Sequence, residues 1–410
     1  MRPMSPHEWL ALVARWIHVI AAISWIGSSF YFIWLDAHLE RLTEKGPDPD
    51  LEGSLWMVHS GGFYRVERRK IGPGRMPKTL HWFKWEAMFT WLSGVVLLTL
   101  VYYTTRGIYL VDPAVSPISR AGAIGVGLGA LFGGWWVYDT LWRWAGEKRA
   151  AIALVLSLVL LAAVAVVLCR TLSGRAAFLH VGALMGVVMT NNVWMRILPA
   201  QTRMIAATER GETPDFSNAE QAKVRSVHNS YMTFPVLFAM MSNHFPGTYG
   251  APERAIVLLL LIALGMGARH LMIGKSPARW WWAAPMAAAG VAVVLLTLPA
   301  RLESVAAGRP DPAMRAALAG QGDAPPFAEV QAVVLARCVA CHAKAPRITS
   351  FGAAPGGVNL EDPSQIVRYA GRIRERVVTT RTMPLGNMTL MTEDERALLA
   401  RWIAHGAKES

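Results

Sequence analysis

The amino-acid sequence predicts an all-α protein: a polytopic transmembrane helix bundle of about eight spans, followed by a small helical domain at the C-terminus. Of the 410 residues, 53% are hydrophobic and only 17% are charged, which is too apolar for an ordinary soluble protein. In addition, apolar runs of roughly 20 residues, the length that crosses a bilayer, recur along residues 1–300 and then stop. The first partner that the sequence predicts is therefore a lipid bilayer.

The spans follow one another with short polar connections. The first run is long enough to cross a membrane and has no small-residue cleavage site near its end, so we expect it to remain as an anchor. The sixth is the shortest and carries polar residues. The predicted spans are residues 10–34, 86–103, 122–138, 150–168, 177–198, 227–241, 254–273 and 281–298.

The basic residues are distributed unevenly among the loops. The net charge is +13, and the lysines and arginines collect in the first, third, fifth and seventh connections. By the positive-inside rule these loops are cytoplasmic, which places both termini on the outer, periplasmic side of the membrane. This pattern argues against nucleic-acid binding. Within the long first loop, residues 55–66 alternate around two glycines and predict a small β-hairpin.

The C-terminal domain contains Cys338-Val339-Ala340-Cys341-His342. This spacing is typical of covalent c-type haem attachment, in which the thiols of Cys338 and Cys341 add to the haem vinyl groups and His342 ligates the iron. A zinc knuckle or a disulfide is the alternative, but the chain has no second ligand pair. We therefore divide the chain into a membrane domain (1–300), a linker (301–325) and a periplasmic c-type cytochrome domain (326–410).

Two helices should enclose this haem. Residues 327–337 predict the first, and residues 392–407 predict the second, with a capping box of Thr392 and Glu395 at its start. The loop between them offers Met383 as the sixth iron ligand, and Met388 and Met391 are the alternatives. A haem with histidine and methionine ligands has no open site, so this domain carries electrons and does not transform a substrate.

Ionisable residues inside membrane spans are costly and are candidates for function. On the predicted periplasmic side, His18 and His180 are candidate axial ligands of a non-covalent b-type haem, because a helix bundle is a suitable container for porphyrin. The alternative for each histidine is a hydrogen bond between helices.

On the predicted cytoplasmic side, arginines and amides gather with histidines. Guanidinium groups and carboxamides suit a planar anion with ring carbonyls and N–H groups, and His228, His81 or His270 would accept a proton. The alternative is that the arginines mark the membrane interface. The anchors in this group are Asn192, Arg196, Asn229 and Arg269.

Four segments, residues 18–27, 80–86, 190–194 and 228–235, together with the C-terminal haem motif, resemble the bacterial membrane-bound urate oxidases fused to cytochrome c. The resemblance covers essentially the whole chain. It implies oxidation of urate to 5-hydroxyisourate, with electrons passing to the c-type haem and on to the respiratory chain through a soluble cytochrome or a terminal oxidase in the periplasm.

Under this hypothesis urate binds in the cytoplasmic half, anchored by Arg196 or Arg269. Asn192 and Asn229 complete the anchor. His228, or else His81, removes a proton and activates water. A different function, a quinol-oxidising electron carrier without purine chemistry, shares every haem feature and is distinguished only by the polar cluster and the resemblance.

Overall fold

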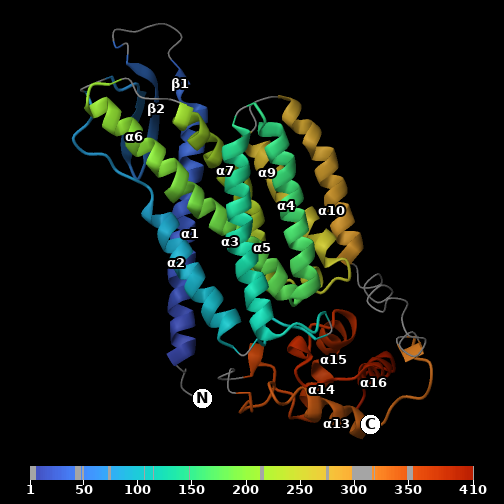
Figure 1. Cartoon of the computed structure of the whole chain (residues 1–410). Coiled ribbons are helices and arrows are strands. Elements are labelled where there is room, and N and C mark those ends of the chain that lie inside the picture. Colours follow the sequence, from blue (N-terminus) through green and yellow to red (C-terminus); the bar gives the residue numbers. More distant parts are fainter. Residues whose placement is uncertain are drawn as a thin grey trace.

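A computed structural model of the chain describes residues 6–41, 48, 50–72, 75–105, 107–113, 115–146, 148–212, 217–273, 277–297, 316–317, 319–348 and 354–409. A bundle of long helices stands on a smaller helical domain, and a three-stranded sheet lies at the opposite end of the bundle (Figure 1). The start of the first helix and the C-terminal domain lie at the same end, as an even number of membrane crossings requires. Most of the predicted linker lies outside the described residues.

Each predicted span corresponds to a helix of the bundle. Several of these helices continue into a short π-helical or 3₁₀ segment. The bundle consists of α1 (Pro6–His38), α2 (Trp85–Leu98) with η1 (Thr99–Tyr103), α3 (Arg120–Ala145), α4 (Ala150–Thr171), α5 (Gly174–Asn192) with η2 (Val193–Ile197) and α6 (Leu198–Glu209), α7 (Ser217–Met241) with η3 (Ser242–His244), α8 (Pro246–Tyr249), α9 (Arg254–Ile273), and η4 (Pro277–Trp282) with α10 (Ala283–Thr297).

Seven helical segments of the described chain are long and apolar enough to cross a membrane, which indicates a membrane protein. The sequence predicts eight spans, and the eighth lies in α7. The first half of α7 reads SNAEQAKVRSVHNS, so its composition is too polar for a span facing lipid. This helix nevertheless packs between α5 and α9, and three of its polar residues, Arg225, Asn229 and Ser230, are buried inside the bundle.

The centre of the bundle is α5, whose side chains are mostly buried. It begins at an N-cap, Ser173, whose hydroxyl accepts a hydrogen bond from the Ala176 N–H at 3.1 Å. Small residues let the neighbouring helices approach it closely. A methyl group added at Gly182 would lie only 2.6 Å from the Cβ atom of Ala239 on α7.

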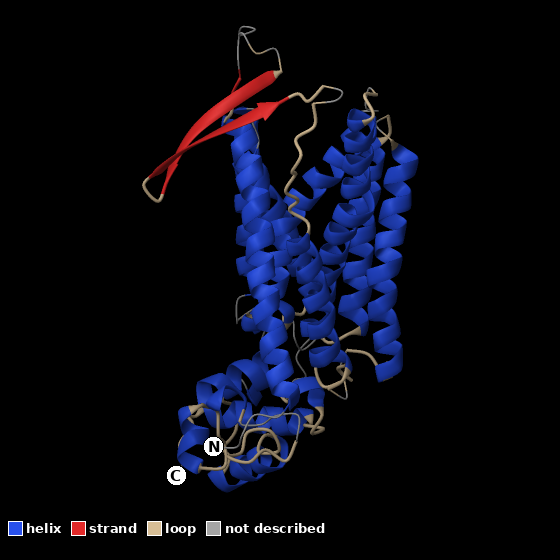
Figure 2. Ribbon diagram, turned by 90° about the vertical axis from the view of Figure 1, so that its left-hand side faces the viewer, coloured by secondary structure: helices blue, strands red, loops and turns tan. Residues whose placement is uncertain are grey.

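The predicted hairpin is confirmed. Strands β2 (Leu51–His59) and β3 (Gly62–Arg69) pair antiparallel, and the short β1 (Glu40–Arg41) adds to the other edge of β2. The turn residues Ser60 and Gly61 both have positive φ, of 50° and 76°, as a two-residue hairpin turn requires. The hairpin slants away from the end of α1 toward the side of the bundle (Figure 2).

The C-terminal domain has its own apolar core. The first of its two long helices has the predicted bounds, and the second ends at Ala404, three residues before the predicted end. The capping box is confirmed: the Glu395 N–H donates to Thr392 Oγ1 at 3.2 Å, and the Thr392 N–H donates to Glu395 Oε2 at 2.8 Å. The elements are α13 (Phe327–Arg337), η5 (Pro355–Gly357), α14 (Pro363–Arg368), α15 (Ala370–Ile373), η6 (Arg374–Thr379), η7 (Leu385–Asn387) and α16 (Glu393–Ala404).

This domain fits closely against the end of the bundle. A methyl group at Gly386 would lie 2.8 Å from the carbonyl oxygen of Val111, in the connection between η1 and α3. A methyl group at Gly250 would lie 3.1 Å from the Cβ atom of Thr380. Glycine is therefore needed on each side of the contact.

Candidate functional site

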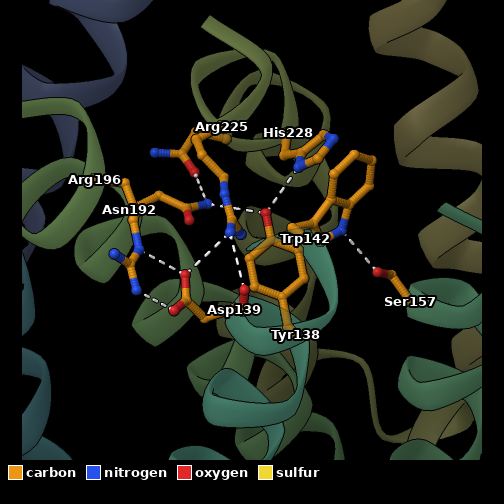
Figure 3. Close-up of polar contacts among 9 residues, drawn as sticks. Tyr138, Asp139, Trp142, Ser157, Asn192, Arg196, Arg225 and His228 are labelled. Carbon is orange, nitrogen blue, oxygen red and sulfur yellow. Dashed lines mark hydrogen bonds and ion pairs between the residues drawn. The ribbon is translucent and has the colours of Figure 1, made fainter. Parts of the chain in front are cut away.

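A cluster of polar side chains lies inside the bundle, in the half nearer the sheet. Its members come from helices that are distant in sequence, and Figure 3 shows most of them pointing toward one another. The polar cluster consists of Tyr138 and Asp139 on α3, Asn192 on α5, Arg196 on η2, and Arg225, His228 and Asn229 on α7.

Asp139 holds two arginines together. Arg196 Nε donates to Asp139 Oδ1 at 2.8 Å, and the other end of the same guanidinium pairs with Oδ2. Arg225 Nη2 donates to the same Oδ1 at 3.0 Å. Asp139 and Arg225 are 4% and 5% exposed. One carboxylate therefore serves two guanidinium groups, and this part of the cluster keeps a net positive charge.

Tyr138 joins this ion-paired group to His228. Tyr138 Oη lies 2.7 Å from His228 Nδ1, and the Arg225 guanidinium carbon lies 4.7 Å from the centre of the tyrosine ring. Asn192 Nδ2 donates both to Tyr138 Oη at 3.2 Å and to Asn229 Oδ1 at 3.0 Å. The result is a continuous hydrogen-bonded path from the amides to the imidazole.

A cavity of about 410 Å³ adjoins the polar cluster. Arg196 and Arg225 belong to both, and the cavity wall also includes Trp142, whose ring centre lies 4.2 Å from that of His228. Neither His228 nor Tyr138 is part of the cavity wall, and Trp142 is the wall residue that contacts His228. The remaining lining comes from the end of α3, the start of α4, the η2–α6 segment and the first half of α7: Arg143, Gly146, Ala150, Met195, Pro199, Ala200, Arg203, Glu220, Gln221, Ala222 and Val224.

Two buried polar atoms of the cluster have no hydrogen-bond partner: Arg225 Nη1 and Asn192 Oδ1. A buried donor or acceptor without a partner costs about 1–3 kcal/mol, and a ligand that supplies partners recovers this energy. Because the cavity wall also carries Arg143 and Arg203 against Glu220, the arrangement suits a small polar anion.

The structure brings together four of the six residues that the sequence suggested for the substrate: Asn192, Arg196, His228 and Asn229. Arg269 belongs to a neighbouring group, where its Nε donates to Ser230 Oγ at 2.9 Å. His81 is exposed in the segment before α2.

Three important members of the site do not stand out in the sequence. Tyr138 and Asp139 end an apolar run, and Arg225 resembles a loop charge because the first half of α7 is polar. One feature of the sequence could have indicated this site. Asp139 is the only carboxylate in α3, and a carboxylate inside a membrane span requires a partner.

His18 and His180 lie far from this cluster and from each other. His18 Nδ1 lies 2.9 Å from the Thr90 carbonyl on α2. The His18 ring also lies against Gly94 on α2, whereas His180 contacts Tyr103 on η1, about 14 Å farther along the same helix at 1.5 Å per residue. The two histidines are therefore not arranged as a ligand pair for one haem.

The surroundings of His180 do not fit a haem ligand. Its side chain is fully buried, Nδ1 is 2.8 Å from the Ala176 carbonyl, and Nε2 is 3.0 Å from Tyr103 Oη. A methyl group at Gly127 would lie 2.8 Å from the same Nε2. Both ring nitrogens are thus engaged and the helices close over the ring, so we derive no electron step through a b-type haem.

The residues of the haem motif do fit their predicted group. His342 Nδ1 lies 3.0 Å from the Val358 carbonyl oxygen. A hydrogen bond of this kind orients the imidazole of a metal-ligating histidine and leaves Nε2 for the metal. Burial lowers the pKa of the His342 imidazole, which keeps the ring neutral. Cys338 and Met383 belong to one apolar cluster of the C-terminal domain. Met391 is buried there too, whereas Met388 is 37% exposed.

The fold and the site together define a class: a membrane helix bundle with a cationic recess for a small anion. The comparison with known families agrees, because residues 5–299 match the family described as urate oxidase N-terminal. The chain therefore belongs to this urate oxidase-related family. No curated protein and no solved structure matches the chain.

Proposed function

We propose that this protein oxidises urate to 5-hydroxyisourate and delivers the electrons to a haem held covalently by Cys338 and Cys341. The observation that carries the proposal is the cavity beside Arg225 and Arg196, in a chain of the urate oxidase-related family. A volume of about 410 Å³ is sufficient for a purine. The same observation disfavours a quinol carrier, because a quinol is neutral and has a long apolar tail.

The reaction is balanced without oxygen as a reactant. Urate and one water give 5-hydroxyisourate, two protons and two electrons. The oxygen of water forms a bond to a ring carbon, and the two electrons leave the purine. The protein must therefore bind the anion, accept protons and provide a route for electrons.

Binding of the anion falls to the arginines of the cavity wall. Arg225 Nη1 is buried and unpartnered, so it is available to a urate carbonyl or ring nitrogen. Asp139 holds both Arg225 and Arg196 in place, and Trp142 supplies a flat aromatic surface next to them. Of the two anchors suggested by the sequence, Arg196 is thus favoured over Arg269.

Removal of a proton falls to His228. Its hydrogen bond with Tyr138 fixes the imidazole at one nitrogen, and Tyr138 is also bonded to Asn192. A proton taken from urate or from the attacking water at the Tyr138 hydroxyl would pass to His228 along this bond. General-base catalysis of this kind typically accelerates a reaction by about 10²–10⁴-fold.

The C-terminal domain completes the proposal. Cys338 and Cys341 would attach the haem, and His342 and Met383 would ligate its iron. When bound, this haem would serve as a one-electron acceptor with a fairly high reduction potential. The positive-inside pattern supports a cytoplasmic cavity and a periplasmic C-terminal domain, from which a soluble cytochrome or a terminal oxidase would take the electrons.

The test uses oxidised membranes that contain the protein, kept without oxygen. Addition of urate should reduce the c-type absorption band and form 5-hydroxyisourate. Membranes in which Cys338 and Cys341 are both replaced by serine provide the control and should lack the band. A band that stays oxidised with urate and is reduced by a quinol would reject the proposal in favour of the electron carrier.

A further inference from the structure

The hairpin β2–β3 has an apolar tip that no other part of the described chain covers. Cross-strand pairing places Val58 opposite Phe63 and Trp56 opposite Arg65, and these four side chains share one face. Trp56, Val58 and Phe63 are 65%, 68% and 80% exposed. Large side chains this exposed outside the membrane spans mark an interaction surface.

The depth of the hairpin indicates what this surface meets. Its other face contacts α1, where Tyr31 Oη donates to Met57 Sδ at 3.7 Å. Tyr31 lies two turns before the end of α1 at His38, about 10 Å back along the helix axis. Because α1 is a candidate membrane span whose apolar run ends at Trp34, Met57 lies at the level of the membrane boundary. The Val58–Phe63 pair lies one step farther toward the tip.

The polarity of the hairpin changes along its length in the same direction. Its charged residues gather toward the base, where Arg68 pairs with Asp36 and Glu52, and Lys70 pairs with Glu52. Beyond Arg65 the tip carries no lysine, arginine or carboxylate, and its one basic side chain is His59. A charged base and an apolar tip match the passage from the headgroups into the acyl chains of a bilayer.

The neighbouring surface of α1 is also apolar. Tyr31, Phe32 and Trp34 are each 41–45% exposed near the same level, so the tip continues a surface that faces lipid. Figure 2 shows the hairpin projecting outward from the bundle, with its turn lower than the end of the long helix next to it.

We propose that the β2–β3 hairpin inserts its tip, Trp56, Val58 and Phe63, into the interfacial layer of the same bilayer that the helices cross. The hairpin thereby fixes the sheet end of α1 to the membrane surface. This role is independent of the proposed reaction, because none of the three residues lines the cavity.

The test places a photoreactive benzoylphenylalanine at position 63 of the full chain in lipid nanodiscs. Illumination should give lipid adducts on the hairpin peptide, detected by mass spectrometry. The same probe at Trp16, which is 69% exposed on α1, is the positive control. At Lys70, whose side chain is 75% exposed at the base, adducts should be at least about fivefold fewer, because that position is in water.

A second variant keeps the proposal testable. Val58→Asp combined with the probe at position 63 should lower the adduct yield about tenfold, since a buried charge opposes insertion of the tip. An unchanged yield at a Trp16 probe in the Val58→Asp background shows that the bundle is intact. Cross-linking of position 63 to a second copy of the chain, or no lipid adduct there while Trp16 gives one, would overturn the proposal.

Discussion

At the scale of single residues, Asp139 is the charge on which the candidate site depends. It is the shared partner of Arg196 and Arg225. Asp139→Asn should leave two guanidinium groups without a counter-charge and destabilise the protein by about 3–5 kcal/mol, the usual cost of breaking a buried ion pair. Thermal unfolding in detergent measures the effect.

The matched control is Asp36→Asn. Asp36 also pairs with an arginine, Arg68, but both side chains are more than half exposed, so its loss should cost at most about 1 kcal/mol. If both variants unfold at the same temperature, Asp139 does not have the role that we give it.

His228 and His270 offer a comparison between two similar pairs. Each histidine has its Nδ1 2.7 Å from a tyrosine hydroxyl, Tyr138 and Tyr231 respectively, but only the His228 pair adjoins the cavity. His228→Ala should lower kcat for urate by about 10²–10⁴-fold with the haem spectrum intact. His270→Ala should change kcat less than about threefold, and equal losses in the two variants would remove the assigned role of His228.

The residues that sequence reasoning missed share a physical cause. Asn192, Arg196, His228 and Asn229 stand out because polar groups in apolar spans are conspicuous. Arg225 does not, because its significance arises only when α7 packs against α3. Helix–helix contacts of this kind depend on which face each helix turns toward the centre of the bundle. A single sequence indicates that face only weakly when the apolar residues are spread around the helix.

At the scale of elements, the approach of α7 to α5 depends on Gly182. Gly182→Ala would place a methyl group 2.6 Å from Ala239 Cβ, and backbone-borne atoms cannot move aside cheaply. We expect a destabilisation of about 1–3 kcal/mol, typical of overpacking. Thermal unfolding measures it.

Gly186, one turn farther along α5, has nothing within 4 Å of an added methyl group. Gly186→Ala should therefore be neutral or stabilise the helix by up to about 1 kcal/mol. A Gly182→Ala variant as stable as Gly186→Ala would show that the two helices are less closely packed than described.

Elements were more predictable than contacts. The bounds of α9, the ends of α2–η1 and the capping box of α16 follow from length, hydropathy and local hydrogen bonding, which a sequence displays directly. The hairpin followed from its two glycines. The contact of the hairpin with Tyr31 could not be predicted. It depends on the direction in which the chain turns between α1 and the hairpin, and no local sequence pattern specifies that direction.

At the scale of the whole molecule, the start of α1 and the C-terminal domain lie at one end and the hairpin at the other (Figure 1). In spheroplasts, a protease that cannot cross the membrane should remove a C-terminal tag and leave uncut a protease site inserted at Gly211, which is exposed in the connection after α6. Inverted vesicles should give the reverse result. Cleavage of both sites from one side would contradict the arrangement.

The continuous helix from Gly174 to Glu209 has a mechanical consequence. Its 36 residues extend for about 54 Å, well beyond a hydrocarbon layer of about 30 Å. One end of this helix forms a wall of the cavity. Just before its other end, the Ser173 hydroxyl donates to the Tyr109 carbonyl at 2.7 Å. Tyr109 lies in the connection between η1 and α3, which the C-terminal domain contacts. One long helix thus joins the cavity to the contact with the C-terminal domain, so the separation of these two regions is fixed by a single element. Under the proposed function, electrons would have to cross this same distance in every turnover.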